Sequence, residues 1–210
     1  MKQQVLLKSC ALLFLLLTLS ACTGVSVKEP GYANKAAYQK RAEKLEVVSE
    51  WGLVGKISLD DGEQGGSGRL QWEVKPGTSE LDFHGAMGRG AWHLQIGPGG
   101  VVLKEANGFE QTSPAVDALI QDRIGWPIPV NALQWWVRGL AAPGAVENEK
   151  IGPQGQLVSL AQFGWSVDFN RYDSVGDFSL PIRLNATRDS YRVKLAISRW
   201  RMDTGHALPN

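Results

Sequence analysis

The chain has 210 residues, a formal charge of +1 and eight Trp. Its length suits one domain with a sizeable core, and its near-neutral charge gives no electrostatic reason to expect a nucleic-acid partner. Its two Cys, Cys10 and Cys22, both lie close to the N-terminus, so a disulfide scaffold is not expected.

The first 22 residues show the three parts of a bacterial lipoprotein signal. Lys2 and Lys8 precede an apolar stretch of about a dozen residues, which ends in Leu19-Ser20-Ala21-Cys22. A membrane-spanning helix needs roughly 20 residues, so a permanent transmembrane anchor is the weaker alternative. An ordinary secretory signal that Cys22 follows by chance is the other alternative. We therefore expect cleavage between Ala21 and Cys22 and a covalent lipid on Cys22.

Cleavage would leave a mature chain with a formal charge of −1 and no free thiol, because Lys2, Lys8 and Cys10 leave with the signal. Two or more acyl chains hold a protein stably on a membrane, whereas one chain holds it only marginally. The residue after Cys22 is Thr23, not the Asp that tends to retain a lipoprotein on the inner membrane. We therefore expect a lipid-anchored outer-membrane protein that faces the periplasm. Residues 22–33, which lack periodicity, are predicted to be the lipidated N-terminus and a flexible tether.

A single domain is expected over residues 34–210, beginning with an amphipathic helix at 34–48 that Asn34 caps. Alternating apolar and polar residues then predict a meander of antiparallel strands, about five before and about four after a helical middle. The first middle helix is expected to start at Ser113-Pro114, with Ser113 as N-cap. The second contains Asn131 and Gln134 at capping-box spacing.

One face of the predicted sheet is apolar and the other is polar and charged. The three short helices are the only elements available to cover the apolar face. The sequence therefore predicts a mainly β fold, a curved sheet with a helical lid over its concave face. Such a lid can leave an internal apolar space.

With these elements the chain resembles the LolB family of outer-membrane lipoprotein receptors. The resemblance covers almost the whole chain, and its motifs are the lipobox at 19–22, WGLVGKI at 51–57, GAMG at 85–88 and, most specifically, GWPIPVNALQWWVRGL at 125–140. It implies an incomplete, half-open antiparallel β-barrel of about eleven strands, which encloses a hydrophobic cavity under three short helices. The alternation pattern accounts for about nine strands, so we expect the others between Leu140 and Leu157 or in the Gly62–Gly68 loop.

The resemblance also implies a function. The family accepts acylated lipoproteins from the soluble periplasmic carrier LolA and places them in the inner leaflet of the outer membrane. Each buried methylene is worth about 0.8 kcal/mol, so an acyl chain of about fifteen methylenes gains roughly 12 kcal/mol and cannot leave a carrier through water on a useful timescale. Direct transfer between two cavities avoids that barrier. The expected partners are a LolA-like carrier, acylated lipoproteins and the outer membrane. We expect a monomer, no nucleic acid and no cofactor beyond the covalent lipid.

Large apolar residues on the apolar sheet face and on the helices are the candidate cavity walls. For each residue alone, a plain packed core is an equally good interpretation, and only the number of broad side chains on one face favours a cavity. The candidates for acyl-chain binding are Leu53, Ile57, Leu70, Trp72, Leu81, Phe83, Trp92, Leu94, Leu119, Ile124, Leu133, Trp136, Val137 and Leu140.

Met87 is the sharpest single candidate, in a predicted membrane-insertion loop of Gly85, Ala86, Met87 and Gly88. Loop tips are normally polar, whereas an exposed flexible Met suits insertion into lipid or into the acyl chains being delivered. The position matches the apolar tip of the family's protruding loop, where Leu is usual. The alternative is that Met87 folds back onto the domain.

The sequence gives little support for an enzyme or a metal site. His84, His93 and His206 lack the spacing of metal ligands, and no Gly-x-Ser-x-Gly elbow is present. The glycine-rich segment at 65–68 precedes a strand and not a helix, so it is not a phosphate-binding loop. We expect no metal and no catalytic residue, with a periplasmic lipid hydrolase as a minor alternative. The more serious alternative is a lipoprotein that scaffolds envelope assembly through its sheet edges or its polar face.

Overall fold

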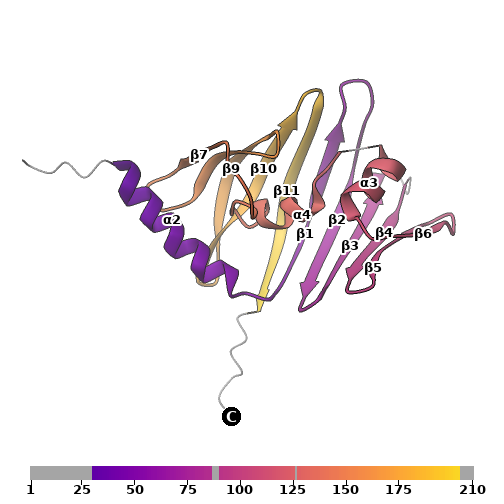
Figure 1. The fold of residues 1–210 in the computed structure, drawn as a ribbon, viewed down its shortest axis with the longest axis horizontal. Coiled ribbons are helices and arrows are strands. Elements are labelled where there is room, and N and C mark those ends of the chain that lie inside the picture. The colour runs from indigo at the N-terminus through magenta and orange to yellow at the C-terminus, as the bar shows by residue number, and fades with distance from the viewer. Residues whose placement is uncertain (1–29, 87–89, 126, 204–210) are drawn as a thin grey trace, which may run out of the picture.

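The computed structural model describes residues 30–86, 90–125 and 127–203. Three helices and eleven strands follow one another along this part of the chain (Figure 1). Their order is α2 (Pro30–Glu46), β1 (Glu50–Asp60), β2 (Gly65–Lys75), β3 (Thr78–Gly85), β4 (Trp92–Gly97), β5 (Gly100–Glu105), β6 (Glu110–Ser113), α3 (Val116–Ile124), α4 (Val130–Trp136), β7 (Asn148–Ile151), β8 (Leu157–Gln162), β9 (Trp165–Val175), β10 (Phe178–Arg188) and β11 (Tyr191–Asp203).

All the described strands form one antiparallel sheet, in the order β6-β5-β4-β3-β2-β1-β11-β10-β9-β8-β7. Strands that are neighbours in the chain pair with one another, and β1 also pairs with β11, which joins the first half of the chain to the last. The edge strands β6 and β7 do not pair, so the barrel stays open. The structure thus confirms the predicted half-open antiparallel barrel of eleven strands with three short helices.

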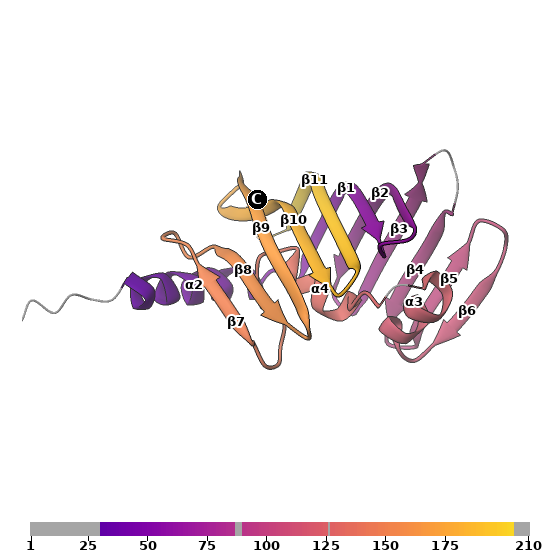
Figure 2. The ribbon, with the colours of Figure 1, turned by 90° about the horizontal axis from the view of Figure 1, so that it is seen from above.

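The position of the helical lid follows from this strand order. The chain leaves β6 at one edge of the sheet and must reach β7 at the other edge. It crosses the concave face on the way, and α3 and α4 lie on that crossing (Figures 1 and 2). The helix α2 lies at the far end of the sheet, in contact with β7. Two of the three predicted lid helices, α3 and α4, therefore cover the apolar face, whereas α2 lies at the end of the sheet.

Alternation along the strands sorts side chains between the two faces of the sheet. In β1, Trp51, Leu53 and Ile57 are buried on the concave face, whereas Lys56 is exposed on the convex face. Their partners on β11 follow the same pattern: Trp51 stands opposite Met202 and Ile57 opposite Leu195. The concave face and the lid helices together make one hydrophobic core.

Two edge strands account for the shortfall in the predicted strand count. The strand β7 lies between Leu140 and Leu157, where an additional strand was expected. The other additional strand, β6, falls at Glu110–Ser113 and not in the Gly62–Gly68 loop, whose second half belongs to β2, so that alternative was wrong. Both strands have only four residues, and none of these side chains is fully buried. A short edge strand therefore carries too weak an alternation to be recognised.

The predicted boundary of the first helix was also wrong. The helix α2 begins at Pro30, so residues 30–33 are helical and do not belong to a tether. Proline suits the first helical turn because the backbone N–H that it lacks would have no partner there. Asn34 does not cap the helix: its side-chain nitrogen donates to the carbonyl of Ile151 over 3.1 Å and joins α2 to β7.

The two middle helices start without the predicted side-chain caps. The helix α3 begins at Val116 with Ala115 as N-cap, and the Ser113 hydroxyl instead accepts from the backbone N–H of Ala115 over 3.1 Å. The helix α4 follows Pro129, which has no capping side chain. Tertiary contacts supply an acceptor instead, because Asp117 of α3 accepts from the N–H of Asn131 at 3.4 Å. Local capping patterns cannot reveal such a partner.

Candidate functional site

A hollow of about 670 Å³ opens between the concave face of the sheet and the C-terminal end of α3. Its volume lies within the roughly 300–1,000 Å³ that is usual for small-molecule sites. Strands β1 to β5 supply its apolar wall, which includes Leu59, Phe83, Trp92 and Leu103. Of the predicted cavity residues, Phe83 and Trp92 line this opening.

Two glycines of β2 create the space. Gly66 and Gly68 occupy concave-face positions, opposite Leu59 and Ile57 of β1. A Cβ atom at Gly68 would approach the Phe83 ring to 2.5 Å, so the glycine lets that ring lie against β2. Among the described residues, a Cβ atom at Gly66 would meet nothing within 4 Å. The floor of the hollow is thus open because a glycine stands where a strand would normally place an inward side chain.

The wall beside these glycines is flat and aromatic. Phe83 and Trp92 stand opposite each other on β3 and β4, with ring centroids 5.3 Å apart and planes inclined by 21°. Both rings are half-buried. Stacked aromatic rings present a broad apolar surface that a flexible acyl chain can lie along.

An ion pair joins the lid to the sheet at the rim of the hollow. The Nη2 atom of Arg123 in α3 lies 2.6 Å from Oε1 of Glu105 in β5, and the guanidinium lies 3.9 Å from the centre of the Phe109 ring. Both charged side chains remain partly exposed, so the pair contributes modestly, about 0.2–1 kcal/mol. It holds the end of α3 near the opening without sealing it.

The other predicted cavity residues lie deeper, in the packed core. Each of them has 6% or less of its surface exposed, and the structure packs them against one another, so an acyl chain would reach them only by displacing that packing. Their contact with lipid therefore stays a prediction. They are Leu53, Ile57, Leu70, Trp72, Leu81, Leu94, Leu119, Leu133, Trp136, Val137 and Leu140. The side chain of Ile124 lies outside the described part of the structure.

The predicted insertion loop begins beside the hollow. Gly85, the last residue of β3, and Ala86 both line it. Met87 and Gly88 lie outside the described residues, as do Ala21 and Cys22. Membrane insertion by the loop, signal cleavage and lipidation therefore stay predictions.

A buried arginine at the base of α4 was not recognised in the sequence. Arg138 is 6% exposed, and its guanidinium donates to the carbonyls of Gln134 and Leu45 at 3.1 and 3.2 Å. It also lies 5.4 Å from the Trp51 ring centre and 5.0 Å from that of Trp135. Burial lowers the pKa of Arg138 to about 10, so the group stays charged at neutral pH. A single basic residue in a predicted amphipathic helix is expected to face water, so the burial of Arg138 was not predicted. Only the neighbouring pair Trp135-Trp136 indicated apolar surroundings.

A second arginine fastens α2 to the turn after α4. The Nη1 atom of Arg41 donates to the carbonyl of Gly139 at 2.7 Å, and Nη2 donates to those of Arg138 and Ser179 at 2.7 and 2.9 Å. Burial lowers the pKa of Arg41 from its ordinary value. The hydroxyl of Tyr38 accepts from the N–H of Ala141 over 2.9 Å. These bonds fix the end of the lid helix against α2 and β10.

A larger hollow of about 850 Å³ lies between α2 and the segment that follows α4. Its lining includes the charged residues Lys35, Glu46, Glu147 and Glu149, and Lys35 forms an ion pair with Glu149 at 3.3 Å. It costs free energy to replace the water around charged groups with apolar matter. The aromatic hollow also has charged residues in its lining, Asp61, Glu105 and Arg123, but its stacked aromatic wall suits acyl chains better.

Within residues 30–86, 90–125 and 127–203, no three His, Cys, Asp or Glu side chains lie close enough together to hold a metal ion. No helix in the same ranges is both long enough and apolar enough to cross a membrane.

Comparison with known proteins identifies the family. The family model described as "Outer membrane lipoprotein LolB" matches residues 49–200. The chain is 34% identical over 190 residues to the outer-membrane lipoprotein LolB of Pseudomonas syringae pv. syringae (strain B728a), a match that covers 89% of this chain and 92% of the relative. It is 33% identical over 198 residues to that of Pseudomonas putida (strain GB-1), covering 92% and 96%.

A solved structure agrees with the fold. A Vibrio parahaemolyticus domain, described as that of an outer membrane lipoprotein-sorting protein, aligns with a TM-score of 0.50 and 9% identity. The alignment covers 84% of this chain and 94% of that domain, and it supports the fold alone. The family match over residues 49–200 and the identity to the two Pseudomonas proteins show that the chain belongs to the LolB family of outer membrane lipoproteins.

Proposed function

We propose that this protein is an outer-membrane receptor, which accepts acylated lipoproteins from a LolA-like periplasmic carrier and inserts them into the outer membrane. Its family supports a role in outer-membrane lipoprotein localisation. The observation that carries the finer proposal is the open apolar hollow between the concave face and α3. An acyl chain can enter there without first displacing the packed core.

The physical need for such a site comes from the cargo. An acyl chain of about fifteen methylenes gains roughly 12 kcal/mol on burial, so it does not cross water freely. A receptor must offer apolar surface before the carrier withdraws its own. The stacked Phe83 and Trp92 rings provide that surface at the opening. No energy source is needed if the receptor, and then the bilayer, binds the chains more tightly than the carrier does.

The proposal assigns the delivery step to the start of the β3–β4 connection. Gly85 and Ala86 line the hollow, so a chain held against Phe83 lies beside the segment that continues into Met87. A lipid on Cys22 would keep this site near the bilayer. Acceptance and delivery would thus take place at neighbouring positions on one opening.

A transfer experiment tests the proposal. A carrier loaded with a fluorescent triacylated lipoprotein is mixed with a chain that starts at residue 22 and has the substitution Cys22→Ser. Every described element lies beyond residue 29, so this chain retains the whole sheet and lid. We expect the label to move to the receptor without ATP. Label that stays on a carrier competent to release it to another receptor would overturn the proposal.

A filled hollow should block transfer. Gly66→Phe places a ring where a Cβ atom meets no described residue within 4 Å, so it should occupy the hollow while the domain still folds. Gly99→Phe is the matched control, because Gly99 lies in the β4–β5 turn and its Cβ atom would also meet nothing. We expect about tenfold slower acceptance in the first variant and unchanged acceptance in the control. Equal rates of acceptance in the two variants would show that acyl chains do not enter the protein through this hollow.

The scaffold alternative retains one supporting observation. Within the described strands, β6 and β7 each lack a strand partner on one side, although α2 contacts β7, and unpaired edges are templates for pairing with another chain. A scaffold would need these edges and not the hollow. Replacing an outward residue of β7, as in Lys150→Pro, should then abolish function while Gly66→Phe leaves it intact.

A further inference from the structure

The convex face of the sheet carries a row of residues that crosses six neighbouring strands, from β3 to β9. Cα pairing places each member directly opposite the next. Four members are Lys or Arg, one is His, and one small residue stands in the middle. In spatial order this basic row consists of His84, Arg69, Lys56, Ala196, Arg183 and Arg171.

The row places like charges beside each other with no acid between them. Lys56 stands opposite Arg69, and Arg183 stands opposite Arg171. All four side chains are exposed, and in the part of the chain that the structure describes none of them forms an ion pair. Like charges directly opposite each other destabilise a sheet. This arrangement therefore costs stability unless an external anion balances it.

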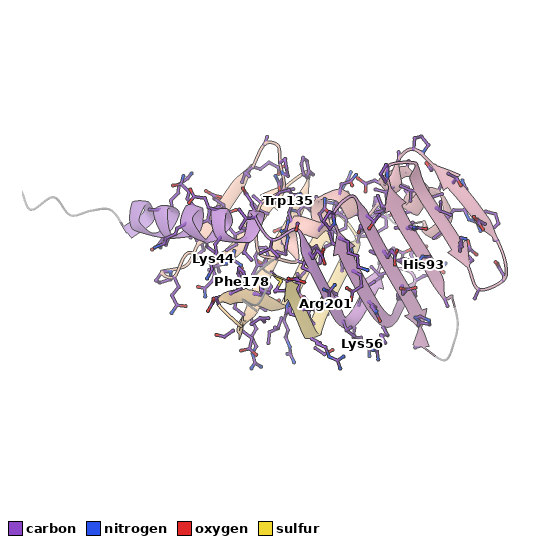
Figure 3. The ribbon with its side chains drawn as sticks, turned by 90° about the horizontal axis from the view of Figure 1, so that it is seen from below. Lys44, Lys56, His93, Trp135, Phe178 and Arg201 are labelled. Carbon is purple, nitrogen blue, oxygen red and sulfur yellow. The ribbon has the colours of Figure 1, made fainter. Side chains whose placement is uncertain are left out.

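Elsewhere on the convex face, acidic side chains do pair with basic ones. Arg201 lies on the same side of the sheet as Lys56, away from Trp135 (Figure 3), and it forms an ion pair with Glu73. His93 of β4 lies 2.8 Å from a carboxylate oxygen of Asp82. The absence of acids is thus a property of the basic row and not of the whole convex face.

The row borders a hollow of about 670 Å³. Because Ala196 is small, space remains between Lys56 and Arg183, and both line this hollow together with the apolar residues Val54 and Ile182. An adjoining hollow of about 360 Å³ shares Lys56 and Arg183 and adds Lys194. A cationic rim around a partly apolar floor matches a group that combines phosphate with hydrocarbon.

We propose that the basic row binds the phosphate groups of anionic phospholipids at the membrane surface. The charge of the row and its empty hollow match a phospholipid headgroup, and Ala86 lines both this hollow and the aromatic one. Figure 2 shows that β3 ends on the side of the sheet away from α3 and α4. Contact between the row and the bilayer would thus bring the start of the β3–β4 connection to the lipid surface.

An acidic carrier protein is the less suitable occupant of this face. A carrier that transfers acyl chains must face the aromatic hollow, which opens on the concave side under α3. The basic row lies on the opposite face of the same sheet, so one carrier cannot cover both. A membrane can hold the row while a carrier approaches the lid. A lipid on Cys22 would keep the start of α2 within about 29 Å of the bilayer, because eight residues up to Pro30 span at most that length.

This inference rests on the proposed function only in placing the protein at a membrane, and vesicle binding tests it without any carrier or cargo. The chain that starts at residue 22 with Cys22→Ser is sedimented with vesicles of phosphatidylethanolamine and phosphatidylglycerol, and with uncharged vesicles of phosphatidylethanolamine and phosphatidylcholine. We expect tighter binding to the anionic vesicles, which high salt removes because the interaction is electrostatic.

The decisive variant combines Lys56→Gln, Arg69→Gln and Arg183→Gln. Each cation near an anionic membrane contributes roughly fivefold, so binding to anionic vesicles should fall about 100-fold, with no change for uncharged vesicles. The control combines Lys40→Gln, Lys75→Gln and Arg192→Gln, three exposed cations outside the row, and should retain most of the binding. Equal losses in both variants would mean that net charge alone attracts the protein, and would overturn the assignment.

Two further measurements separate binding by charge from loss of folding and from carrier docking. A variant with Lys56→Arg, Arg69→Lys and Arg183→Lys keeps the charges, so it should bind like the natural chain; its failure would overturn a charge-based site. The neutralised variant should unfold at the same or a higher temperature, because it loses like-charge repulsion. If it binds anionic vesicles normally but no longer accepts cargo from the carrier, the row belongs to carrier docking and the proposal is wrong, although the receptor function stands.

Discussion

The indole Nε1 of Trp136 donates a hydrogen bond of 3.0 Å to the side-chain oxygen of Gln162, and both residues are buried. The same oxygen accepts from the N–H of Ala142 at 3.0 Å, and the Gln162 amide nitrogen donates to the carbonyl of Ala142 at 2.7 Å. Trp136 ends α4 and Gln162 ends β8. One fully buried amide therefore ties the lid helix and the segment after it to the sheet.

Gln162→Leu should destabilise the protein by about 3 kcal/mol. The substitution leaves the Trp136 indole and both backbone groups of Ala142 buried without partners, and each such group costs about 1–3 kcal/mol. Urea unfolding followed by tryptophan fluorescence measures the change. Gln71→Leu, at an exposed position of β2, is the control and should change stability by less than about 0.5 kcal/mol. Similar stability of the two variants would show that the lid does not depend on this amide.

Gly139→Ala should lower the free energy of unfolding by more than the backbone strain at a positive φ alone. Gly139 has φ +72°, and a Cβ atom there would lie 2.6 Å from the Tyr172 hydroxyl and 2.9 Å from Nη2 of Arg41. Gly77 has nearly the same φ, +77°, but a Cβ atom there would meet nothing within 4 Å. Gly77→Ala therefore measures the strain, about 1–2 kcal/mol.

The expected loss for Gly139→Ala is at least about 3 kcal/mol, because Tyr172 and Arg41 must both move and each makes partly buried hydrogen bonds. The comparison uses chemical unfolding of both alanine variants under identical conditions. If the two variants lose the same stability, the close packing of α2, β9 and the turn after α4 is looser than the structure shows.

Arg41→Met should release α2 from the sheet. The substitution keeps the length and apolar character of the stem but leaves the carbonyls of Gly139, Arg138 and Ser179 without their donor. We expect a loss of about 2 kcal/mol and faster amide hydrogen exchange in α2. The neighbouring exposed residue supplies the control, Lys40→Met, which should leave both quantities unchanged. Unchanged exchange in the Arg41 variant would mean that apolar contacts alone hold the helix.

The fold was largely predictable because the long strands bury one face and expose the other. The alternation of Trp51, Leu53 and Ile57 with Lys56 survives in the structure residue by residue. The edge strand β6 was missed because its four residues bury no large side chain. The helix caps failed for two reasons: the Ser113 hydroxyl closes a local turn with Ala115 before the helix, and the N–H of Asn131 has its acceptor on another helix, at Asp117.

The candidate site was less predictable than the fold. The pattern placed Trp72 and Phe83 on the same apolar face, but it could not show that Trp72 is 1% exposed whereas Phe83 borders an open hollow. That difference depends on Gly66, which stands opposite Leu59 of β1 and leaves space where an inward side chain would normally stand. The basic row was equally hidden, since its members come from six strands and meet only through the register of the sheet.

Met87→Glu should separate acceptance of cargo from its delivery. Met87 follows Gly85 and Ala86, which line the aromatic hollow, so the substitution adds a charge next to the proposed exit and not inside the hollow. A carboxylate resists transfer into lipid, whereas Met is apolar and flexible. We expect normal uptake of labelled lipoprotein from the carrier and at least about tenfold slower transfer from the receptor to vesicles. Gly99→Glu, in the β4–β5 turn, is the control and should leave both steps unchanged, whereas equal loss of both steps with Met87→Glu would argue against a delivery loop.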